Sequence, residues 1–475
     1  MPTGLDHDRG ATGQTGSMSR PDARSAPDVM HGAGPGPEVF ANRRRRVAEL
    51  VGEGGALIVP AGVESPRNHD VDHEFRQASQ FWWLTGFPEP DAVAVIVPGH
   101  PDGDYHLFVR PRDPERETWD GHRAGVEGAT ARFGADAARP IAELRDGLVG
   151  LTVGRRNVLY RLGERLDDTV SGLVGGGRNR RDRLGDVMPE AIVDPSAILD
   201  ELRLLKDAAD LDSLRRAGAL AAEGHREAMR LAEPGVSERR LQGAMDWVWR
   251  SQGSPRNGYP SIVASGANAC VLHYTENADV VTDGDLVLID AGCEVDQLSA
   301  DITRTFPANG RFSAAQRAVY DVVLAAQHAA LAAVRPGATI RSPHEAARAV
   351  IAEGLVELGL IPAGLDDVLA MGLDAEFFMH GTSHWLGLDV HDVGSYREGE
   401  AHRGLVETMA LTIEPGIYFI PMLLEELRAG PHAGAVNWKA VEKLLPFGGV
   451  RIEDDVRVTE EAPENLSRNA FAEVV

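Results

Sequence analysis

The sequence predicts a two-domain α/β protein, and three observations support this fold class. The chain has 475 residues, which is longer than a single hydrophobic core usually supports. In residues 39–200, short apolar runs typical of strands alternate with helical segments. In residues 201–475, a pair of helices followed by strands occurs twice. We therefore predict a small N-terminal α/β domain at 39–200 and a larger α+β domain at 201–475.

The composition excludes several classes of function. A net charge of −24 disfavours nonspecific binding to nucleic acid or to an anionic membrane. No stretch approaches the roughly 20 apolar residues that span a bilayer, and the N-terminus lacks the apolar core of a signal peptide. The two cysteines, Cys270 and Cys293, indicate no disulfide framework and are interpreted as small buried hydrophobic residues. We expect a cytoplasmic protein.

The N-terminal segment is predicted to be disordered. Residues 1–38 are rich in Gly, Pro, Ser and Asp, so they bury too little apolar surface to offset the entropy of ordering. Four consecutive arginines, Arg43 to Arg46, then open a predicted helix over 41–51. A basic run can contact nucleic acid, but in this acidic chain we interpret it as a solvated helix face.

The first domain is predicted from short apolar runs separated by helical segments. Strands are expected at 56–59, 92–97, 106–109 and 157–160. Helices are expected at 140–148 and 166–173. The aromatic cluster at 80–87 indicates a core or interface segment, with closure of a substrate pocket as the alternative.

The second domain contains a repeated pattern. A long helix is predicted over 197–231, and a Pro-Gly pair follows it, as another Pro-Gly pair follows the helix over 313–334. Each is followed by a second helix, at 238–251 and 343–358, and then by strands. In the second half these strands are expected at 410–413 and 450–459. The repeat predicts two related halves that share a sheet, and ligand sites often lie at such junctions.

A predicted hairpin over 286–306 carries two acids. If its turn is centred between Val295 and Asp296, Asp290 and Asp301 lie directly opposite each other. Facing carboxylates destabilise a strand pair unless something compensates their charge. A shared divalent cation would do so, because hard cations prefer carboxylate oxygens. A solvated loop with two incidental acids is the alternative.

Three downstream segments carry further polar residues. Residues 380–391 contain three histidines, and Glu414 and Glu453 each lie beside apolar strand residues. Taken singly, each would be a hydrogen-bonded histidine or a solvated acid. Buried, unpaired carboxylates become protonated rather than remain charged. Four acids together therefore indicate a bound charge of about +4, which corresponds to two divalent ions.

These segments resemble the pita-bread metallopeptidases, and specifically the aminopeptidase P family. The resemblance rests on the stretches LHYTEN, LVLIDAGCE, DITRTFP, HGTSHWLGLDVHDVG, TIEPGIY and RIEDDV, and on FWWLTGF in the first domain. It extends across residues 41–475. It implies a pseudo-twofold pita-bread catalytic domain and release of the N-terminal residue from peptides with proline in the second position.

The resemblance also implies a dinuclear metal site, usually with manganese. Asp290 would bind one ion, Asp301 and Glu453 would bridge both, and His384 and Glu414 would complete the other. The attacking group would be a hydroxide held between the ions.

Further roles follow from the resemblance. His273 and His391 would face the substrate, His380 would lie in the second sphere, and Arg451 would pair with metal-ligand carboxylates. The resemblance implies three other substrate-binding positions: Tyr418 beside this network, Trp82 reaching into a neighbouring subunit, and Arg403 as a pocket arginine. The family forms homo-oligomers, so a dimer or tetramer is expected.

Three alternatives remain open. A prolidase shares the fold and all five ligands but cleaves Xaa-Pro dipeptides. Creatinase-like enzymes use the fold without metals, and non-catalytic binding modules have lost the ligands, whereas every ligand position here holds a ligand-capable residue. The chain also carries an insertion at 421–446, which could cover the site or decorate the surface.

Overall fold

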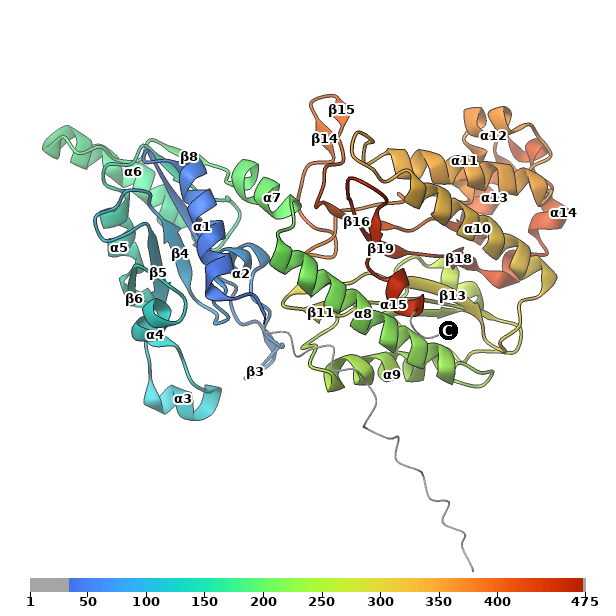
Figure 1. Cartoon of the computed structure of the whole chain (residues 1–475), viewed down its shortest axis with the longest axis horizontal. Helices are drawn as coiled ribbons and strands as arrows, with labels where there is room; N and C mark the ends of the chain where they lie inside the picture. Colours follow the sequence, from blue (N-terminus) through green and yellow to red (C-terminus); the bar gives the residue numbers. More distant parts are fainter. Residues whose placement is uncertain (1–33, 473–475) are drawn as a thin grey trace, which may run out of the picture.

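The computed structural model describes residues 34–472, which form two domains (Figure 1). Most of the predicted tail, residues 1–33, lies outside the described residues. Its last residues are helical, because helix α1 (Pro37–Val51) begins with a proline in its first turn, where no backbone N–H is needed. None of the helices within 34–472 has the length and apolar character needed to cross a bilayer.

The N-terminal domain is built on one six-stranded sheet with the order β6-β5-β4-β1-β7-β8. The strands are β1 (Gly55–Pro60), β4 (Val93–Ile96), β5 (Tyr105–Val109), β6 (Ala137–Pro140), β7 (Asn157–Leu159) and β8 (Ala191–Val193). β1 pairs antiparallel with β4 and parallel with β7. Four strands match the predicted ones. β6 and β8 are short and only partly buried, so their sequences carry little strand signal.

Helices cover both faces of this sheet. They are α1, α2 (Ser79–Thr85), α4 (Gly125–Ala131), α5 (Leu144–Thr152) and α6 (Asp167–Leu184), whereas α3 (Pro114–Asp120) buries no residue. Alternate residues of β1 point to opposite faces, so Leu57 packs in the core with α1 and α2, while Ile58 packs with α5 and α6. A short hairpin, β2 (Pro66–Asn68) and β3 (Val71–Asp72), is fully exposed.

Only half of the arginine run forms the predicted solvated face, because Arg45 and Arg46 are exposed but the other two arginines are buried. Arg43 and Arg44 are only 4% and 8% exposed. Arg43 forms ion pairs with Asp207 at 2.8 Å and Asp210 at 2.7 Å, which lie at the start of the second domain. Arg44 donates to the carbonyl of Leu84. Arg43 therefore joins the two domains, an outcome that depends on partners distant in sequence, whereas Arg44 bonds within the first domain.

The helix predicted over 197–231 is two helices, α7 (Ser196–Leu204) and α8 (Ala208–Leu231). The backbone becomes extended at Leu205. The Asp207 side chain then accepts hydrogen bonds from the backbone N–H groups of Ala209 and Asp210, which caps the second helix. A local N-cap outweighed the continuous apolar periodicity on which the prediction relied.

The second domain contains the predicted helix–helix–strand unit twice, with α8 and α9 on one side of the strands and α10 and α11 on the other (Figure 1). The first unit comprises α8, α9 (Glu238–Ser251), β9 (Ile262–Ser265), β10 (Leu286–Asp290) and β13 (Thr303–Pro307). The second comprises α10 (Ala314–Ala332), α11 (Ser342–Glu357), β16 (Ala410–Ile413), β17 (Gly416–Tyr418), β18 (Gly449–Arg451), β19 (Asp454–Arg457) and β20 (Glu464–Asn465). The capping box at Ser313 starts α10 as expected.

Shorter elements connect and decorate these units. They are β11 (Glu294–Val295), β12 (Leu298–Ser299), α12 (Leu365–Met371), β14 (Arg397–Glu398), β15 (Ala401–His402), α13 (Pro421–Ala429), α14 (Trp438–Val441) and α15 (Arg468–Ala472). The insertion at 421–446 thus forms two short helices.

The hairpin register differs from the predicted one by two residues. Asp290 pairs with Thr303, not with Asp301, and Val295 pairs with Leu298. The turn therefore consists of Asp296 and Gln297, with φ angles of 52° and 66°. Two consecutive left-handed residues make the tight turn that best matches strand twist. Asp301 consequently lies diagonal to Asp290.

The two units meet along β13 and the segment that joins β18 to β19. The Thr305 hydroxyl donates to the carbonyl of Arg451 at 2.9 Å, and the backbone N–H of Glu453 donates to the carbonyl of Thr303 at 3.1 Å. The strand predicted over 450–459 is interrupted at Glu453. This interruption lets Glu453 bond to the first unit while β18 and β19 pair within the second.

Candidate metal centre

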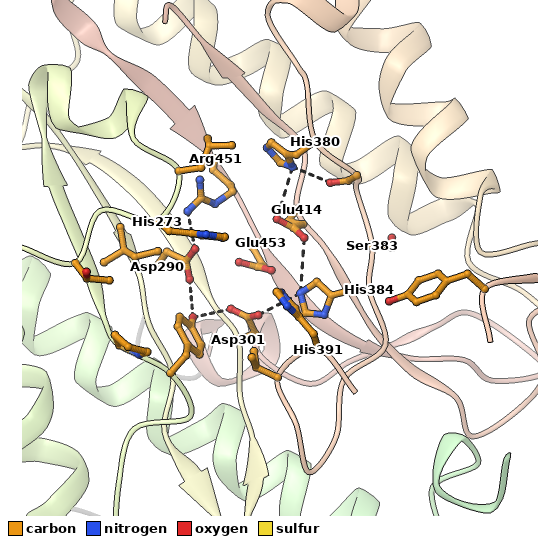
Figure 2. Close-up of a pocket in the computed structure, with 18 residues that line it drawn as sticks. His273, Asp290, Asp301, His380, Ser383, His384, His391, Glu414, Arg451 and Glu453 are labelled. Carbon is orange, nitrogen blue, oxygen red and sulfur yellow. Dashed lines mark hydrogen bonds and ion pairs between the residues drawn. The ribbon is translucent and has the colours of Figure 1, made fainter. Parts of the chain in front are cut away.

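A cavity of about 650 Å³ lies where the two units meet, and we call it the metal-centre cavity (Figure 2). All five predicted metal ligands and all four predicted catalytic residues line it. They are Asp290, Asp301, His384, Glu414 and Glu453, together with His273, His380, His391 and Arg451.

The acids reach the cavity because each lies at the end of, or just beyond, a strand. Asp290 is the last residue of β10, and Asp301 lies two residues before β13. Glu414 follows β16, where Pro415 ends the strand. Glu453 occupies the interruption between β18 and β19. Strand ends from both units therefore supply carboxylates to one point.

His384 lies among these acids. The backbone N–H of Thr412 in β16 donates to its carbonyl at 3.0 Å, which fixes its segment beside that strand. Its Nδ1 lies 3.0 Å from the carbonyl of Trp385 and donates to it, so Nε2 faces the carboxylates. Nε2 is 3.3 Å from Asp301 and 3.7 Å from Glu414. Ligand atoms of Asp301, His384 and Glu453 lie within 4.8 Å of one another.

Tyr259, which the sequence analysis did not single out, joins the two acids of the first unit. Its hydroxyl lies 2.5 Å from Asp290 Oδ1 and 2.6 Å from Asp301 Oδ1 (Figure 2). A tyrosine between a loop glycine and a proline gives no local signal of this role. Its hydroxyl orients both carboxylates toward the cavity.

Arg451 is 4% exposed and holds the opposite side of Asp290. Its Nη2 donates to Asp290 Oδ2 at 2.5 Å, and its Nε donates to the hydroxyl of Thr303 at 3.2 Å. That hydroxyl donates in turn to Glu453 Oε2 at 2.7 Å. Arg451 thus links the carboxylates of both units.

Burial and mutual repulsion strongly shift the pKa values of the acids. Burial, and then the charges of Asp301 and Glu414, raise the pKa of Glu453 well above its ordinary value. Burial likewise raises the pKa of Glu414 to about 7. Burial would lower the pKa of His384, but its hydrogen bond to Asp301 and the charge of Glu414 outweigh that effect and raise it to about 9.

The donor set fits divalent cations. Four carboxylates converge with one imidazole, and the single guanidinium beside them balances only part of their charge. Such a cluster is neutralised by protons or by cations. Carboxylate oxygens with one imidazole nitrogen suit ions such as Mn²⁺ and Zn²⁺.

A neutral histidine and a tyrosine form a hydrogen-bonded chain that ends at the guanidinium of Arg451. Burial, and then the charge of Arg451, lower the pKa of His380 to about 3. His380 Nδ1 donates to the carbonyl of Gly381 at 2.7 Å, so Nε2 accepts from the Tyr418 hydroxyl at 2.8 Å. That hydroxyl accepts from Arg451 Nη1 at 2.9 Å. Tyr418 is fully buried and acts through these contacts rather than from the cavity wall.

His273 and His391 are the more exposed histidines of the cavity. The His391 ring is edge-on to that of His384, with 4.3 Å between centroids. Burial, and then the charge of His384, lower the pKa of His391. Both side chains are available to a ligand.

Two of the predicted substrate-binding residues lie elsewhere. Trp82 Nε1 donates to the carbonyl of Asp296 at 3.1 Å, and the residue does not line the metal-centre cavity of its own chain. Arg403 forms ion pairs with Glu201 at 2.7 Å and Glu398 at 2.9 Å, also outside the cavity. No residue of the 421–446 insertion lines the cavity.

Comparisons with known proteins identify the family of this chain. Residues 212–460 match the model of metallopeptidase family M24, and residues 40–160 match the aminopeptidase P N-terminal domain. The Xaa-Pro aminopeptidase of Escherichia coli is 38% identical over 90% of this chain and 94% of its own length. The Xaa-Pro dipeptidase of Homo sapiens is 33% identical over 90% of each chain.

A solved structure of the Pseudomonas aeruginosa aminopeptidase PepP superimposes with a TM-score of 0.85 and 42% identity, and covers 92% of this chain and 96% of that one. The predicted combination of a small α/β domain with a pita-bread domain is thereby confirmed. The chain belongs to metallopeptidase family M24 and is a metal-dependent hydrolase.

Proposed function

We propose that this chain is a Xaa-Pro aminopeptidase, which releases the first residue of peptides that carry proline in the second position. One observation carries the proposal: four carboxylates and one imidazole converge in a single cavity of a chain that belongs to family M24. The 38% identity to the Escherichia coli Xaa-Pro aminopeptidase supports this specificity.

The chain binds divalent metal, and we propose two ions per chain with manganese as the native metal. Asp290 would hold one ion, Asp301 and Glu453 would contact both, and His384 and Glu414 would hold the other. When bound, such ions lower the pKa of water and polarise the scissile carbonyl.

The surrounding residues keep these ligands oriented. Arg451 and Tyr259 each form a hydrogen bond of 2.5 Å with Asp290, one to each carboxylate oxygen. The His380–Tyr418 pair holds the guanidinium in place. Such outer contacts fix the direction of carboxylate lone pairs, and their loss typically weakens metal binding.

His273 and His391 would contact the substrate. Both line the metal-centre cavity without being predicted ligands. An imidazole N–H at this wall could donate to the scissile carbonyl oxygen as its negative charge develops. The site need not supply an acceptor for an amide hydrogen at the scissile bond, because the nitrogen of an Xaa-Pro bond carries none.

We further propose a homo-oligomer, a dimer or tetramer. The role of Trp82 toward a neighbouring subunit stays a prediction, because its indole N–H is already bonded within its own chain. The cytoplasmic location and the pocket role of Arg403 also stay predictions.

Prolidase activity is the second candidate function, which the similarity to the human Xaa-Pro dipeptidase favours. The two activities differ in whether the substrate extends beyond proline. The test compares cleavage of Ala-Pro and Ala-Pro-Ala at equal manganese concentration. Release of alanine from the tripeptide supports the aminopeptidase, whereas cleavage of the dipeptide alone contradicts it.

A paired substitution tests the metal centre itself. Glu453→Gln keeps the side-chain shape but removes a charge from the cavity, so we expect activity to fall at least 100-fold and about one ion per chain to be lost. Glu460→Gln, at an exposed position outside the cavity, is the matched control and should change neither. Metal content is measured by elemental analysis. Equal metal content and activity in both variants would contradict the assignment of Glu453.

A further inference from the structure

A second cavity, of about 190 Å³, adjoins the metal-centre cavity, and we call it the basic annex. The two cavities share Gly381, Ser383 and Tyr396 as a common wall. In Figure 2, Ser383 lies on the segment that connects His380 to His384, beside the carboxylate cluster. The rest of the annex is formed by Ile340, Arg341, His344, Thr382, Arg397 and His402.

The annex and the metal-centre cavity have opposite electrostatic character. The metal-centre cavity is lined by four carboxylates and one arginine. The annex is lined by two arginines and two histidines and by no acid. This local reversal stands out in a chain with a net charge of −24. A concave site lined by one sign of charge concentrates ligands of the opposite sign.

The annex arginines are not neutralised by the protein. Neither Arg341 nor Arg397 forms an ion pair with an acid within residues 34–472, and Arg397 donates one hydrogen bond to the carbonyl of Glu400. The nearby acid Glu398 is instead paired with Arg403 at 2.9 Å. The guanidinium groups therefore retain N–H donors for a ligand.

Two further observations concern the polar residues that form the annex wall. The Ser383 Oγ atom is buried and makes no hydrogen bond within the described residues. The His344 ring lies against the Thr382 hydroxyl at 3.0 Å. Burial, and then the charges of Arg341 and Arg348, lower the pKa of His344 to about 4, so this ring is neutral at pH 7 and adds no charge to that of the arginines.

We propose that the basic annex is a carboxylate-binding subsite for the part of the peptide that follows proline, with Arg341 and Arg397 as the groups that recognise the carboxylate. This inference rests on the proposed aminopeptidase function. Arginine is suited to the task, because its planar fork binds both oxygens of a carboxylate.

The direction of the peptide follows from charge. An aminopeptidase binds one residue before the scissile bond. That residue carries the free N-terminal ammonium group of the peptide, which the annex arginines would repel. The carboxylate must therefore come from the leaving side of the substrate. It is either the C-terminal carboxylate of a short peptide or an acidic side chain of a longer one.

Peptide pairs that differ in a single charge test the subsite. We compare kcat/KM for Ala-Pro-Ala, Ala-Pro-Ala-Ala and Ala-Pro-Ala-Ala-Ala, each with a free and with an amidated C-terminus. We expect the free acid to be preferred roughly 5- to 10-fold at one of these lengths, as for a partly exposed charge-assisted pair. Amidated peptides that carry Asp or Asn after proline separate the side-chain source from the terminal one.

Two substitutions link this preference to the annex. Arg341→Gln and Arg397→Gln should each reduce the acid-to-amide ratio toward 1 while leaving cleavage of the amides nearly unchanged. Arg335→Gln removes the same charge from an exposed turn outside both cavities, so it should keep the wild-type ratio. Added salt should also lower the ratio in the wild-type protein.

The outcomes separate the subsite from the function on which it rests. Cleavage of acid and amide peptides at equal rates would overturn the subsite and leave the aminopeptidase intact. An equal loss of activity on both peptides in the arginine variants would show a structural role and overturn it as well. Failure to cleave any of these peptides would reject the proposed function, and the subsite with it.

Discussion

Replacing Tyr259 with phenylalanine is expected to weaken metal binding while leaving the fold intact. The hydroxyl lies 2.5 Å from Asp290 and 2.6 Å from Asp301, but it carries one proton and can donate to only one carboxylate at a time. One hydrogen bond to a charged group contributes roughly 1.5–3 kcal/mol. We therefore expect the affinity for Mn²⁺ to fall about 10- to 100-fold, the usual effect of removing such an outer contact.

The assay is calorimetric titration of metal-free protein with Mn²⁺, and the chain offers a matched control. The hydroxyl of Tyr274 donates to Glu238 at 2.9 Å, and neither of these two residues lines the metal-centre cavity. Tyr274→Phe therefore removes a comparable tyrosine–carboxylate bond without touching a predicted ligand. It should lower thermal stability and leave the metal affinity unchanged. Wild-type metal affinity in Tyr259→Phe would refute the argument that this hydroxyl orients the ligands.

Three other expectations follow from the structure. The pKa values of His384 and Glu414 are raised to about 9 and about 7, so near neutral pH the metal-free protein holds protons that a cation must displace. Metal affinity should therefore rise from pH 6 to pH 9, and calorimetry in buffers of different ionisation enthalpy should detect proton release; a pH-independent affinity would contradict these shifts. Arg43→Met removes the cation between the N-cap acid of α8, Asp207, and Asp210 in its first turn, and unfolding in urea should show a loss of roughly 3–5 kcal/mol. Gln297→Gly replaces a residue with a φ of 66° and a buried, unbonded side-chain oxygen, so the melting temperature should rise by a few degrees, in line with about 1 kcal/mol. A lower melting temperature would show that the side chain contributes more than its strain costs.

Local chemistry explains which features the sequence predicted well. Helix α9 and strand β16 have the predicted boundaries, and α10 begins at its predicted capping box. These elements depend on caps and periodicity within a few residues. The acids at strand ends were identified for the same reason, since an acid after an apolar run is visible without knowing its neighbours.

The incorrect predictions involve distant partners or exact backbone angles. The hairpin register was off by two residues because two consecutive left-handed residues, Asp296 and Gln297, formed the turn. The prediction that Arg43 lies on an exposed helix face was wrong, because its partners lie more than 160 residues away in the sequence. Tyr259 was missed because its role depends on two acids 31 and 42 residues downstream.

The sequence by itself determined the kinds of group that can meet at the centre: four acids, one imidazole ligand and a supporting arginine, each tied to a strand end or a glycine-rich segment. Only the tertiary structure decided their arrangement. The backbone of Glu453 bonds to that of Thr303, and Arg451 reaches Asp290, because β13 lies against the β18–β19 junction. Such contacts form when two units pack together, and no local pattern encodes their distances. The basic annex has the same origin, since its arginines come from the N-cap position of α11 and from a hairpin more than 50 residues later.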